Sequence, residues 1–492
     1  MFLGIDLGTS GIKVIAINDA GEILADHSSP LTVSNPKPLW SEQTPEDWWR
    51  ALVTAMAGIQ LKLGEQTNNI RAIGLSGQMH GATFLDAHGQ VLRPCILWND
   101  GRSGLECEEL SARLKDFQLR SGNVAMPGFT APKVMWVAKH EPEVFAKTAK
   151  ILLPKDYLAF RLTGLYRSDM SDAAGTLWLN PAQRDWDDEL LAASGLDRSY
   201  MPELLEGCEI AGILSNNAAL ALGLPQIPVV IGGGDNACGA IGVGVTEPGQ
   251  AFISLGTSGV LFAVSEGHRA SPENTLHAFC HCLPERWHQM SVSLSAANSL
   301  AWFAGIVGQT IDALLRELDD SGISETDVSF LPYLSGERTP HNNPNASGLF
   351  FGLKNSTGRP QMTLAVLEGV AFSCADGYQA FSAAQTPIHD ISLIGGGARS
   401  PRWRQMLSDV LQRPMIFRDG GEVGPALGAA RLAQLSEHYH LPRIEFNHKV
   451  HEICPPPPVL EAHQPDESLQ TYYADKLATY RQLYQQTKQL MN

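Results

Sequence analysis

The sequence predicts an α/β protein made of two similar halves, and two observations support this. The pentapeptide Leu-Gly-Thr-Ser-Gly occurs at Leu7–Gly11 and returns unchanged at Leu255–Gly259, about half of the 492-residue chain later. Self-similarity at that distance is typical of a duplicated architecture. In both halves, short apolar segments also alternate with longer segments of helical periodicity, which is the pattern of α/β domains. The length is enough for two large domains, each with its own core.

Each copy of the pentapeptide lies at the tip of a predicted β-hairpin. Apolar and β-branched residues flank the Gly-Thr-Ser-Gly tip, which predicts strands over 2–7 and 12–17 in the first copy and over 251–255 and 260–264 in the second. The pattern further predicts strands over 22–25, 70–75, 151–153, 226–231, 391–394 and 415–417. It predicts helices over 45–63, 154–164, 361–384, 401–411 and 468–490.

Two of these helices show an apolar face at helical spacing. In the helix over 45–63 the face consists of Trp48, Leu52, Ala55, Met56 and Ile59. In the last helix it consists of Tyr473, Leu477, Tyr480 and Tyr484. We expect the last helix to pack on the body of the protein through this stripe.

Composition excludes several classes of function. A hydrophobic content of 44% and a charged content of 18% are ordinary for a globular protein. The net charge of −16 argues against general affinity for nucleic acid or for an anionic membrane. A phosphate ligand is still compatible with this charge, because backbone N–H groups can bind phosphate. The acidic surface is also compatible with a homodimer.

The cysteines and the apolar runs indicate a cytoplasmic protein. The eight cysteines are scattered and form no CxxC pair, so reduced thiols are expected. The first apolar run is interrupted by Asp6 and lacks a basic region before it, so no signal peptide is expected. The longest uncharged run, Gly249–Ser265, is too short and too polar for a membrane span.

The Gly-Thr-Ser-Gly tips are candidate phosphate-binding loops. The chain contains neither GxxxxGK[ST] nor GxGxxG, which excludes a P-loop and a dinucleotide fingerprint. The glycines of the tips let the backbone approach a ligand, and N–H groups and hydroxyls can then surround phosphate oxygens. For one copy alone a plain turn is the simpler interpretation. Two identical copies on two similar hairpins favour phosphate binding.

Asp6 is a candidate metal-binding residue. It lies two residues before the first tip, where a carboxylate can organise Mg²⁺ and its waters against a phosphate. The second copy has Ser254 at the matching place, so only the first hairpin would carry metal chemistry. A solvated residue at a strand end is the alternative, and the apolar surroundings of Asp6 disfavour it.

Two further glycine-rich segments each allow two interpretations. GGGDN (232–236) follows a predicted strand, and its Asp235 is suited either to general-base catalysis or to capping a helix. GGGARS (395–400) joins a strand to a helix. Its glycines suit either a nucleotide lying flat on the backbone or close packing of the helix on the strand. The residues alone leave both pairs of alternatives open.

Three clusters in the first half combine aromatic rings with polar groups, as polyol-binding pockets do. They are LWSEQ (39–43), SGQMHG (76–81) and ILWNDGR (96–102). Each cluster alone is also compatible with an ordinary loop, and Met79 by its type is a core residue. The group His277, Cys280, His281 and Cys282 matches no usual zinc spacing, so we expect no metal there and expect a structural role for His288.

Taken together, these motifs resemble the FGGY family of carbohydrate kinases along nearly the whole chain. Further segments that carry the resemblance are GFTAPKVMWVAKHEP (128–142), YLSGERTPHNNP (333–344) and GLFFGLKNSTGRPQMTLAVLEG (348–369). The resemblance implies an actin-like fold, in which two ribonuclease-H-like domains face each other across a cleft. It implies a sugar-binding domain over 1–246, a nucleotide-binding domain over 247–440, and a tail with a packing helix over 441–492.

The resemblance also implies roles for individual residues. Asp235 would be the catalytic base, and Asp6 would support Mg²⁺ and the transferring phosphoryl group. Met79, His80 and Asn236 would contact the substrate, with Trp98, Asp100 and Arg102 in the pocket wall. The residues implied to bind ATP are Gly8, Thr9, Ser10, Gly256, Thr257, Gly395, Gly396, Gly397 and Ala398.

The activity implied is ATP-dependent, Mg²⁺-assisted phosphorylation of D-xylulose, a step of xylose catabolism. The segments SGQMHGAT, LWNDGR, SDMSDAAGT and GGGDNA most resemble family members that act on this ketose. Another ketose or polyol, such as ribulose, is the alternative acceptor. An actin-like ATPase without a small-molecule acceptor, or a non-catalytic sugar sensor, is the alternative of a different class. The candidate base and the polyol-type clusters argue against the ATPase, and a sensor would be expected to have lost Asp6 or Asp235, which this chain retains.

Overall fold

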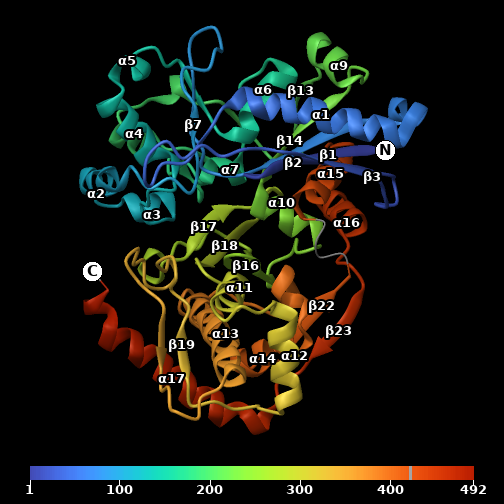
Figure 1. Ribbon diagram of the computed structural model, residues 1–492. Coiled ribbons are helices and arrows are strands. Elements are labelled where there is room, and N and C mark those ends of the chain that lie inside the picture. Colours follow the sequence, from blue (N-terminus) through green and yellow to red (C-terminus); the bar gives the residue numbers. More distant parts are fainter. Residues whose placement is uncertain (420–423, 492) are drawn as a thin grey trace.

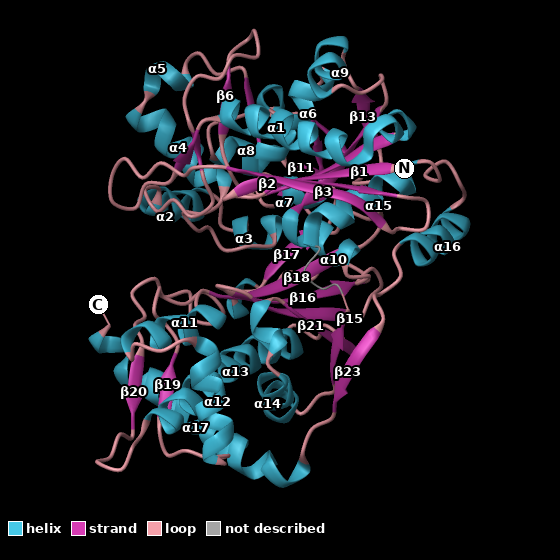
Figure 2. Cartoon of the chain, turned by 45° about the vertical axis from the view of Figure 1, so that its right-hand side comes forward, coloured by secondary structure: helices cyan, strands magenta, loops and turns pink. Residues whose placement is uncertain are grey.

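The computed structural model describes residues 1–419 and 424–491. It is an α/β protein with two large sheets, one in each half of the chain, each covered by helices (Figure 1, Figure 2). The predicted fold class is confirmed. The N-terminal half lies above the C-terminal half in Figure 1, and the first and last parts of the chain lie in different halves.

The N-terminal sheet has six strands in the order β13-β14-β5-β1-β2-β3. β1 runs parallel to β5 and β5 parallel to β14, whereas the β1–β2, β2–β3 and β13–β14 pairs are antiparallel. The bounds are Phe2–Leu7 (β1), Gly11–Ile17 (β2), Ile23–Pro30 (β3), Ala72–Gly77 (β5), Ile210–Ile213 (β13) and Pro228–Gly234 (β14).

The C-terminal sheet repeats this topology and adds one edge strand. Its order is β17-β18-β16-β15-β21-β22-β23, with β15, β21 and β22 parallel and the other pairs antiparallel. The bounds are Gln250–Leu255 (β15), Gly259–Ser265 (β16), His277–Cys280 (β17), Trp287–Ser293 (β18), Asp390–Ile394 (β21), Met415–Arg418 (β22) and Val459–His463 (β23). Both predicted hairpins, β1–β2 and β15–β16, are therefore confirmed, and each is part of the same strand arrangement.

Helices cover both faces of the N-terminal sheet. α1 (Pro45–Leu63) packs on β2 and β3, and α6 (Pro154–Thr163) packs beside it on β14. The predicted apolar face of α1 is buried as expected. α10 (Asp235–Gly242) and α15 (Gly424–Ser436) lie on the opposite face, below the sheet in Figure 1.

α15 belongs to the second half of the sequence but packs on the sheet of the first half. The approach is very close: a Cβ on Gly74 would lie 1.9 Å from the carbonyl oxygen of Ala429, and one on Gly428 would lie 1.7 Å from that of Cys238. Only glycine allows backbones this near to each other. The loop segment GGEVG precedes α15, and its residues 420–423 lie outside the described residues.

The C-terminal sheet packs on α13 (Arg359–Ala383) and its neighbours, shown in Figure 2 below the sheet. The last long helix, α17 (Gln470–Thr487), closes this layer, and Tyr473, Tyr480 and Tyr484 of its predicted stripe are buried in the core. The other face of the sheet meets the N-terminal half, where Phe262 and Phe279 share one apolar cluster with Phe84.

The remaining elements are short and lie around these two sheets. The remaining helices are Gly104–Arg113 (α2), Phe117–Ser121 (α3), Thr130–His140 (α4), Pro142–Phe145 (α5), Met170–Ala174 (α7), Asp188–Ala193 (α8), Asn216–Leu222 (α9), Ala297–Ile306 (α11), Ile311–Ser321 (α12), Pro401–Leu411 (α14) and Arg443–Ile453 (α16). The remaining strands are Glu42–Gln43 (β4), Thr83–Leu85 (β6), Cys95–Ile96 (β7), Lys150–Leu152 (β8), Arg167–Asp169 (β9), Leu179–Asn180 (β10), Asp185–Trp186 (β11), Glu203–Leu205 (β12), Ser329–Leu331 (β19) and Leu349–Phe351 (β20). Within the described ranges, no helix has the length and apolar character needed to cross a membrane.

Candidate active site

A cavity of about 310 Å³ lies between the two halves, in the size range of small-molecule pockets. Residues from both halves line it, so neither half forms the cavity alone. The predicted site residues in its lining are Met79, His80, Trp98, Asp235, Asn236, Gly256 and Thr257. The lining residues not predicted are Met126, Gly128, Phe129, Ser254, Ser258, Val260, His277, Phe279, Met290, Val292 and Arg338.

Asp235 is the first residue of α10 and faces this cavity. The N-cap position belongs to Gly234, so the structure does not support the capping interpretation of Asp235. The Asp235 Oδ1 accepts hydrogen bonds from the backbone N–H (2.7 Å) and the side-chain Nδ2 (2.8 Å) of Asn236. Burial, followed by the charge of Asp6, raises the pKa of Asp235 to about 7. A carboxylate with that pKa is suited to accept a proton near neutral pH.

Asp6 lies near the end of β1, as predicted. Its carboxylate is suited to bind a hard cation. Its Oδ1 is buried and has no hydrogen-bond partner among the described residues. Burial raises the pKa of Asp6 to about 6. A buried carboxylate oxygen without a partner is costly, and Mg²⁺ prefers oxygen ligands of this kind. The residue therefore fits the predicted magnesium site, although it lies outside the lining of the cavity.

The first hairpin tip is tied to the cavity wall through Thr9. The Trp98 Nε1 donates to the Thr9 Oγ1 (2.9 Å), which in turn donates to the Gln78 Oε1 (2.9 Å). The Gln43 Nε2 donates to the Thr9 carbonyl oxygen (2.7 Å). The hydroxyl of Thr9 is thus engaged by neighbouring side chains and holds the Trp98 ring at the cavity. Gly8, Thr9 and Ser10 themselves lie outside the cavity lining.

The second hairpin tip is held from behind by the start of α11. The backbone N–H of Ala296 donates to the Thr257 carbonyl (3.0 Å) and that of Ala297 to the Gly256 carbonyl (2.9 Å). These bonds turn the tip carbonyls away from the cavity. Thr257 and Ser258 line the cavity, so hydroxyl-bearing residues of this tip face the side on which Asp235 lies.

His80 is held in an unusual backbone conformation at the cavity wall. Its φ is 69°, and its carbonyl oxygen accepts from the Lys133 Nζ (2.9 Å) and the Thr130 Oγ1 (3.1 Å). Burial lowers the pKa of His80 to about 3, so the ring is neutral. Its Nδ1 lies 2.8 Å from the Gly175 carbonyl oxygen and must carry the proton, which leaves the Nε2 as an acceptor.

Asp100 and Arg102 do not line the cavity. The Asp100 Oδ2 accepts from the backbone N–H of Ser41 (2.6 Å) and from the Arg102 NH2 (2.6 Å). The Arg102 NH1 also pairs with the Glu42 Oε1 (2.8 Å), and its guanidinium lies 3.6 Å from the ring centroid of Trp40. The two residues form a buried framework that joins the LWSEQ and ILWNDGR clusters behind the cavity.

The GGGARS segment also lies outside the cavity, at the end of β21. Gly395 has a φ of 87°, and a Cβ on Gly397 would lie 2.9 Å from the Cβ of Leu255. A Cβ on the exposed Gly396 would meet nothing within 4 Å. Close packing therefore accounts for Gly395 and Gly397, whereas Gly396 leaves open space in front of the backbone.

The four residues of the HAFCHC segment do not converge on one point, although the Cys282 Sγ lies 3.8 Å from the His281 Nδ1. The His277 Nδ1 lies 3.1 Å from the Asn123 Oδ1, and the ring lines the cavity. The Cys280 Sγ donates to the Pro181 carbonyl (3.5 Å), and the His281 Nδ1 accepts from the Leu283 N–H (3.1 Å). Sequence reasoning missed His277 as a cavity residue, although an imidazole in an apolar strand was a signal for it.

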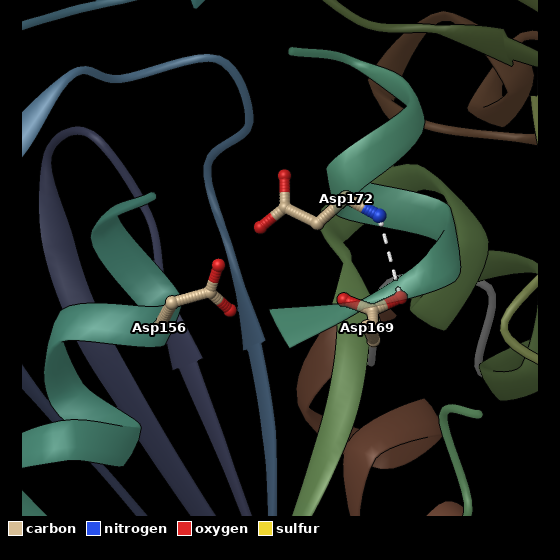
Figure 3. Close-up of side chains that lie close together, drawn as sticks. All are labelled: Asp156, Asp169 and Asp172. Atoms are coloured by element: carbon tan, nitrogen blue, oxygen red, sulfur yellow. Dashed lines mark hydrogen bonds between the residues drawn. The ribbon is translucent and has the colours of Figure 1, made fainter. Parts of the chain in front are cut away.

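Three buried carboxylates, Asp156, Asp169 and Asp172, lie close together outside the cavity lining (Figure 3). The Lys155 ammonium lies among them, 2.6 Å from the Asp156 Oδ1 and 3.0 Å from the Asp169 Oδ1. Burial lowers the pKa of Lys155 less than the neighbouring carboxylates raise it, so the ammonium stays charged. Burial raises the pKa of Asp172 well above its usual range. The Lys155 ammonium offsets one of the three negative charges, and the raised pKa of Asp172 favours its protonated form, which leaves one negative charge on the group.

Comparison with known proteins gives a consistent result along the whole chain. Models of the FGGY family of carbohydrate kinases match twice: the N-terminal domain over residues 1–242 and the C-terminal domain over residues 251–437. The chain is 52% identical to a xylulose kinase of Escherichia coli (strain K12) and 50% identical to one of Klebsiella pneumoniae, with 100% of each chain covered. It superimposes on the crystal structure of a xyloylose kinase from Brucella ovis with a TM-score of 0.94, at 46% identity and with 99% of both chains covered. The xylulose kinase structure from Rhodospirillum rubrum gives a TM-score of 0.91 at 27% identity, over 100% of this chain and 99% of that one.

Proposed function

The chain belongs to the FGGY family of carbohydrate kinases, and we propose that it transfers the γ-phosphoryl group of ATP to the 5-hydroxyl of D-xylulose. D-xylulose as the acceptor rests on the full-length similarity to curated xylulose kinases at 50–52% identity. The observation that carries the chemistry is Asp235, a buried carboxylate with a pKa of about 7 that faces a cavity between the two halves.

Asp235 would act as the general base. As the sugar O5 attacks the γ-phosphorus, its proton passes to the Asp235 carboxylate, a P–O bond forms, and the bond from the γ-phosphorus to the bridging oxygen of ADP breaks. Asn236 fixes the orientation of the carboxylate through its two hydrogen bonds. A positioned base contributes about 10²–10⁴-fold to such a step.

The two hairpin tips would hold the phosphates from opposite sides. Gly8–Ser10 and Gly256–Thr257 offer backbone N–H groups for this task, and Asp6 would hold Mg²⁺ directly or through water. When bound, Mg²⁺ neutralises charge on the β- and γ-phosphates. Gly395–Ala398 would face the adenosine, with Gly396 providing the open backbone surface.

The sugar would lie against Met79, His80 and Trp98 on the N-terminal side of the cavity. The His80 Nε2 is suited to accept a hydrogen bond from a sugar hydroxyl. Asp100 and Arg102 would contribute indirectly, because they stabilise the β4–β7 strand pair that Trp98 follows in the sequence. Residues 1–246 would thus bind sugar and residues 247–440 nucleotide, with residues 441–492 as a packing tail.

A coupled ADP-release assay against pentuloses, hexuloses, glycerol and polyols tests the proposal. We expect ADP release to depend on sugar and D-xylulose to give the highest kcat/KM. An Asp235→Asn variant purified in the same way controls for contaminating kinases. A higher kcat/KM for L-ribulose or glycerol would show that the acceptor is wrong, and equal ADP release without any sugar would show an ATPase instead.

A further inference from the structure

The guanidinium of Arg338 is a half-buried cation at the cavity that the mechanism above does not use. Arg338 comes from the C-terminal half and is among the lining residues. Among the described residues, its side-chain hydrogen-bond partner is the His277 Nε2, 3.5 Å from its NH1. No carboxylate of the described residues forms an ion pair with it. A guanidinium has five N–H donors, so several of them remain for a ligand.

The backbone around Arg338 is fixed on both sides. The buried carboxylate of Glu337 accepts hydrogen bonds from the N–H groups of Arg338 (2.8 Å) and Leu294 (3.0 Å) and from the Ser293 hydroxyl (2.9 Å). The N–H of Thr339 donates to the carbonyl oxygen of Val292 in β18 (3.0 Å). A side chain on a backbone held in this way is placed for a specific contact.

The hydrogen-bond roles around His277 can be assigned from its neighbours. The Asn123 Nδ2 donates to the carbonyls of Ser121 (2.9 Å) and Ala278 (3.1 Å), so its Oδ1 is an acceptor. The His277 Nδ1 beside that Oδ1 must therefore donate. The His277 Nε2 is left to accept from Arg338, and it orients the guanidinium.

A series of ring contacts links the Arg338 side of the cavity to His80. His277 contacts Phe129 (ring centroids 5.4 Å apart), and Phe129 contacts His80 (4.6 Å). Arg338 therefore lies near His80, and its charge contributes to lowering the pKa of that ring. Asp235 lies near Asp6, whose charge contributes to raising the pKa of Asp235.

The C2 oxygen of the acceptor is suited to a hydrogen-bond donor. In a 2-ketopentose, ring closure joins O5 to C2, so O5 is free to accept a phosphoryl group only in the open-chain form. That form has a ketone at C2, and its oxygen only accepts hydrogen bonds. The neutral His80 Nε2 is itself an acceptor and cannot serve this oxygen. Arg338 has only donors.

We propose that Arg338 donates hydrogen bonds to the C2 carbonyl oxygen of the open-chain ketose and so selects ketoses over polyols. The inference rests on the proposed function, because it concerns the acceptor of the same reaction. The contact comes from the C-terminal half, so the sugar would be held by both halves at once. The hydroxyl oxygen of a polyol can also accept from Arg338, but the hydrogen of that hydroxyl needs an acceptor, which Arg338 does not offer.

The test compares Arg338→Met and Arg338→Lys with the parent, using D-xylulose and the two polyols formed by reducing its C2, xylitol and D-arabinitol. The kcat/KM for D-xylulose should fall by about 10–150-fold in Arg338→Met, the loss of a hydrogen bond to a charged group. The kcat/KM of the polyols as substrates, or their inhibition constants as competitive inhibitors, should change less than threefold. The KM for ATP should stay within twofold, and Arg338→Lys should recover part of the activity.

Arg316→Met on the exposed face of α12 is the matched control and should behave as the parent. Circular dichroism checks that the variants are folded; if Arg338→Met is not, Arg338→Lys carries the comparison. The role of Arg338 would be overturned if kcat/KM fell equally for the ketose and the polyols, if the KM for ATP rose, or if kcat/KM for D-xylulose did not fall at all. If the parent itself does not phosphorylate D-xylulose, the proposed function fails, and that outcome is separate from the variant result.

Discussion

Asp6 and Asp235 are two buried carboxylates close enough for the charge of Asp6 to raise the pKa of Asp235. Burial is the larger cause, and the two effects together raise the pKa of Asp235 to about 7. Burial also raises the pKa of Asp6, to about 6. Both groups bind protons more tightly in the folded state than in the unfolded state. Their contribution to stability is therefore present at acidic pH and is lost as the pH rises to about 7.

Asp235→Asn should separate catalysis from stability. We expect kcat to fall at least 10²-fold, because the amide cannot accept the proton, while the KM for sugar stays within threefold. The melting temperature should rise at pH 8 by roughly 1 °C for each 1 kcal/mol gained in a chain of 492 residues, since a buried negative charge is removed. The gain should shrink at pH 5, where the folded parent holds a proton on Asp235. Activity within threefold of the parent would end the assignment of the base.

The pH dependence of the parent gives an independent check of the same group. The rate should rise with pH through about 7 as Asp235 loses its proton, and then level off. The profile of kcat/KM for the sugar reports this ionisation in the free enzyme. A flat profile between pH 5.5 and 8.5 would contradict a base with this pKa.

Asp6→Asn should affect the phosphoryl group rather than the sugar. We expect kcat to fall by about 10²-fold or more and the Mg²⁺ concentration for half-maximal rate to rise, since one hard oxygen ligand is lost. The KM for D-xylulose should stay within threefold. Asp26→Asn on the exposed edge of β3 is the control, because Asp26 pairs only at the surface with Lys62. Parental kcat at saturating Mg²⁺ would remove Asp6 from the mechanism.

Lys133→Met should loosen the backbone of His80. The Lys133 Nζ donates to the carbonyls of His80 (2.9 Å) and Gly128 (2.7 Å), and methionine can make neither bond. We expect the KM for sugar to rise about tenfold, the cost of one to two hydrogen bonds. Lys139→Met, on the exposed side of the same helix, should leave the KM unchanged.

The same variant should change how stability depends on pH. Burial lowers the pKa of Lys133 to about 7, so between pH 7 and pH 10 the unfolded chain binds more protons than the folded one. The parent therefore gains stability from this group as the pH rises through that window. Lys133→Met should lack this gain, so its stability relative to the parent should be better at pH 7 than at pH 9.5. If the difference in unfolding free energy between Lys133→Met and the parent is the same at both pH values, a neutral Lys133 is contradicted.

Gly428→Ala should weaken the contact between α15 and α10. Its Cβ would lie 1.7 Å from the Cys238 carbonyl oxygen, and both backbones would have to move. We expect a loss of about 2–4 kcal/mol in the free energy of unfolding, typical of overpacking at a rigid contact. Gly267→Ala, where the new Cβ meets nothing within 4 Å, is the control and should be neutral. Equal melting temperatures for the two variants would contradict the close contact.

Local patterns allowed the elements to be predicted, whereas long-range contacts did not follow from them. The helix over 45–63 and the strand over 2–7 have the predicted bounds, because their periodicity is set by a buried face. The strand before Asp235 runs three residues further than predicted, through the glycines to Gly234. Glycines lack the side-chain pattern that marks a strand, so this extension was not visible in the sequence.

The candidate site was predictable where one motif supplied several of its residues. Met79 with His80, and Asp235 with Asn236, lie at the cavity, and each pair is adjacent in the sequence. Arg338 and His277 were missed as site residues, because only the folded chain brings them to the cavity. The signal available for Arg338 was a charged residue in the turn between apolar segments of YLSGERTPH. Nothing local distinguished it from the many surface arginines.

The position of α15 has a consequence for how the chain is made. Because α15 covers the lower face of the N-terminal sheet, a nascent chain that ends near residue 246 leaves the glycine-lined face of β1 and β5 without its cover. At the ~5–20 residues per second of ribosomal synthesis, that face would wait on the order of 10–40 s for the helix to emerge. The half of the protein that is synthesised first is thus completed only when most of the second half has been made.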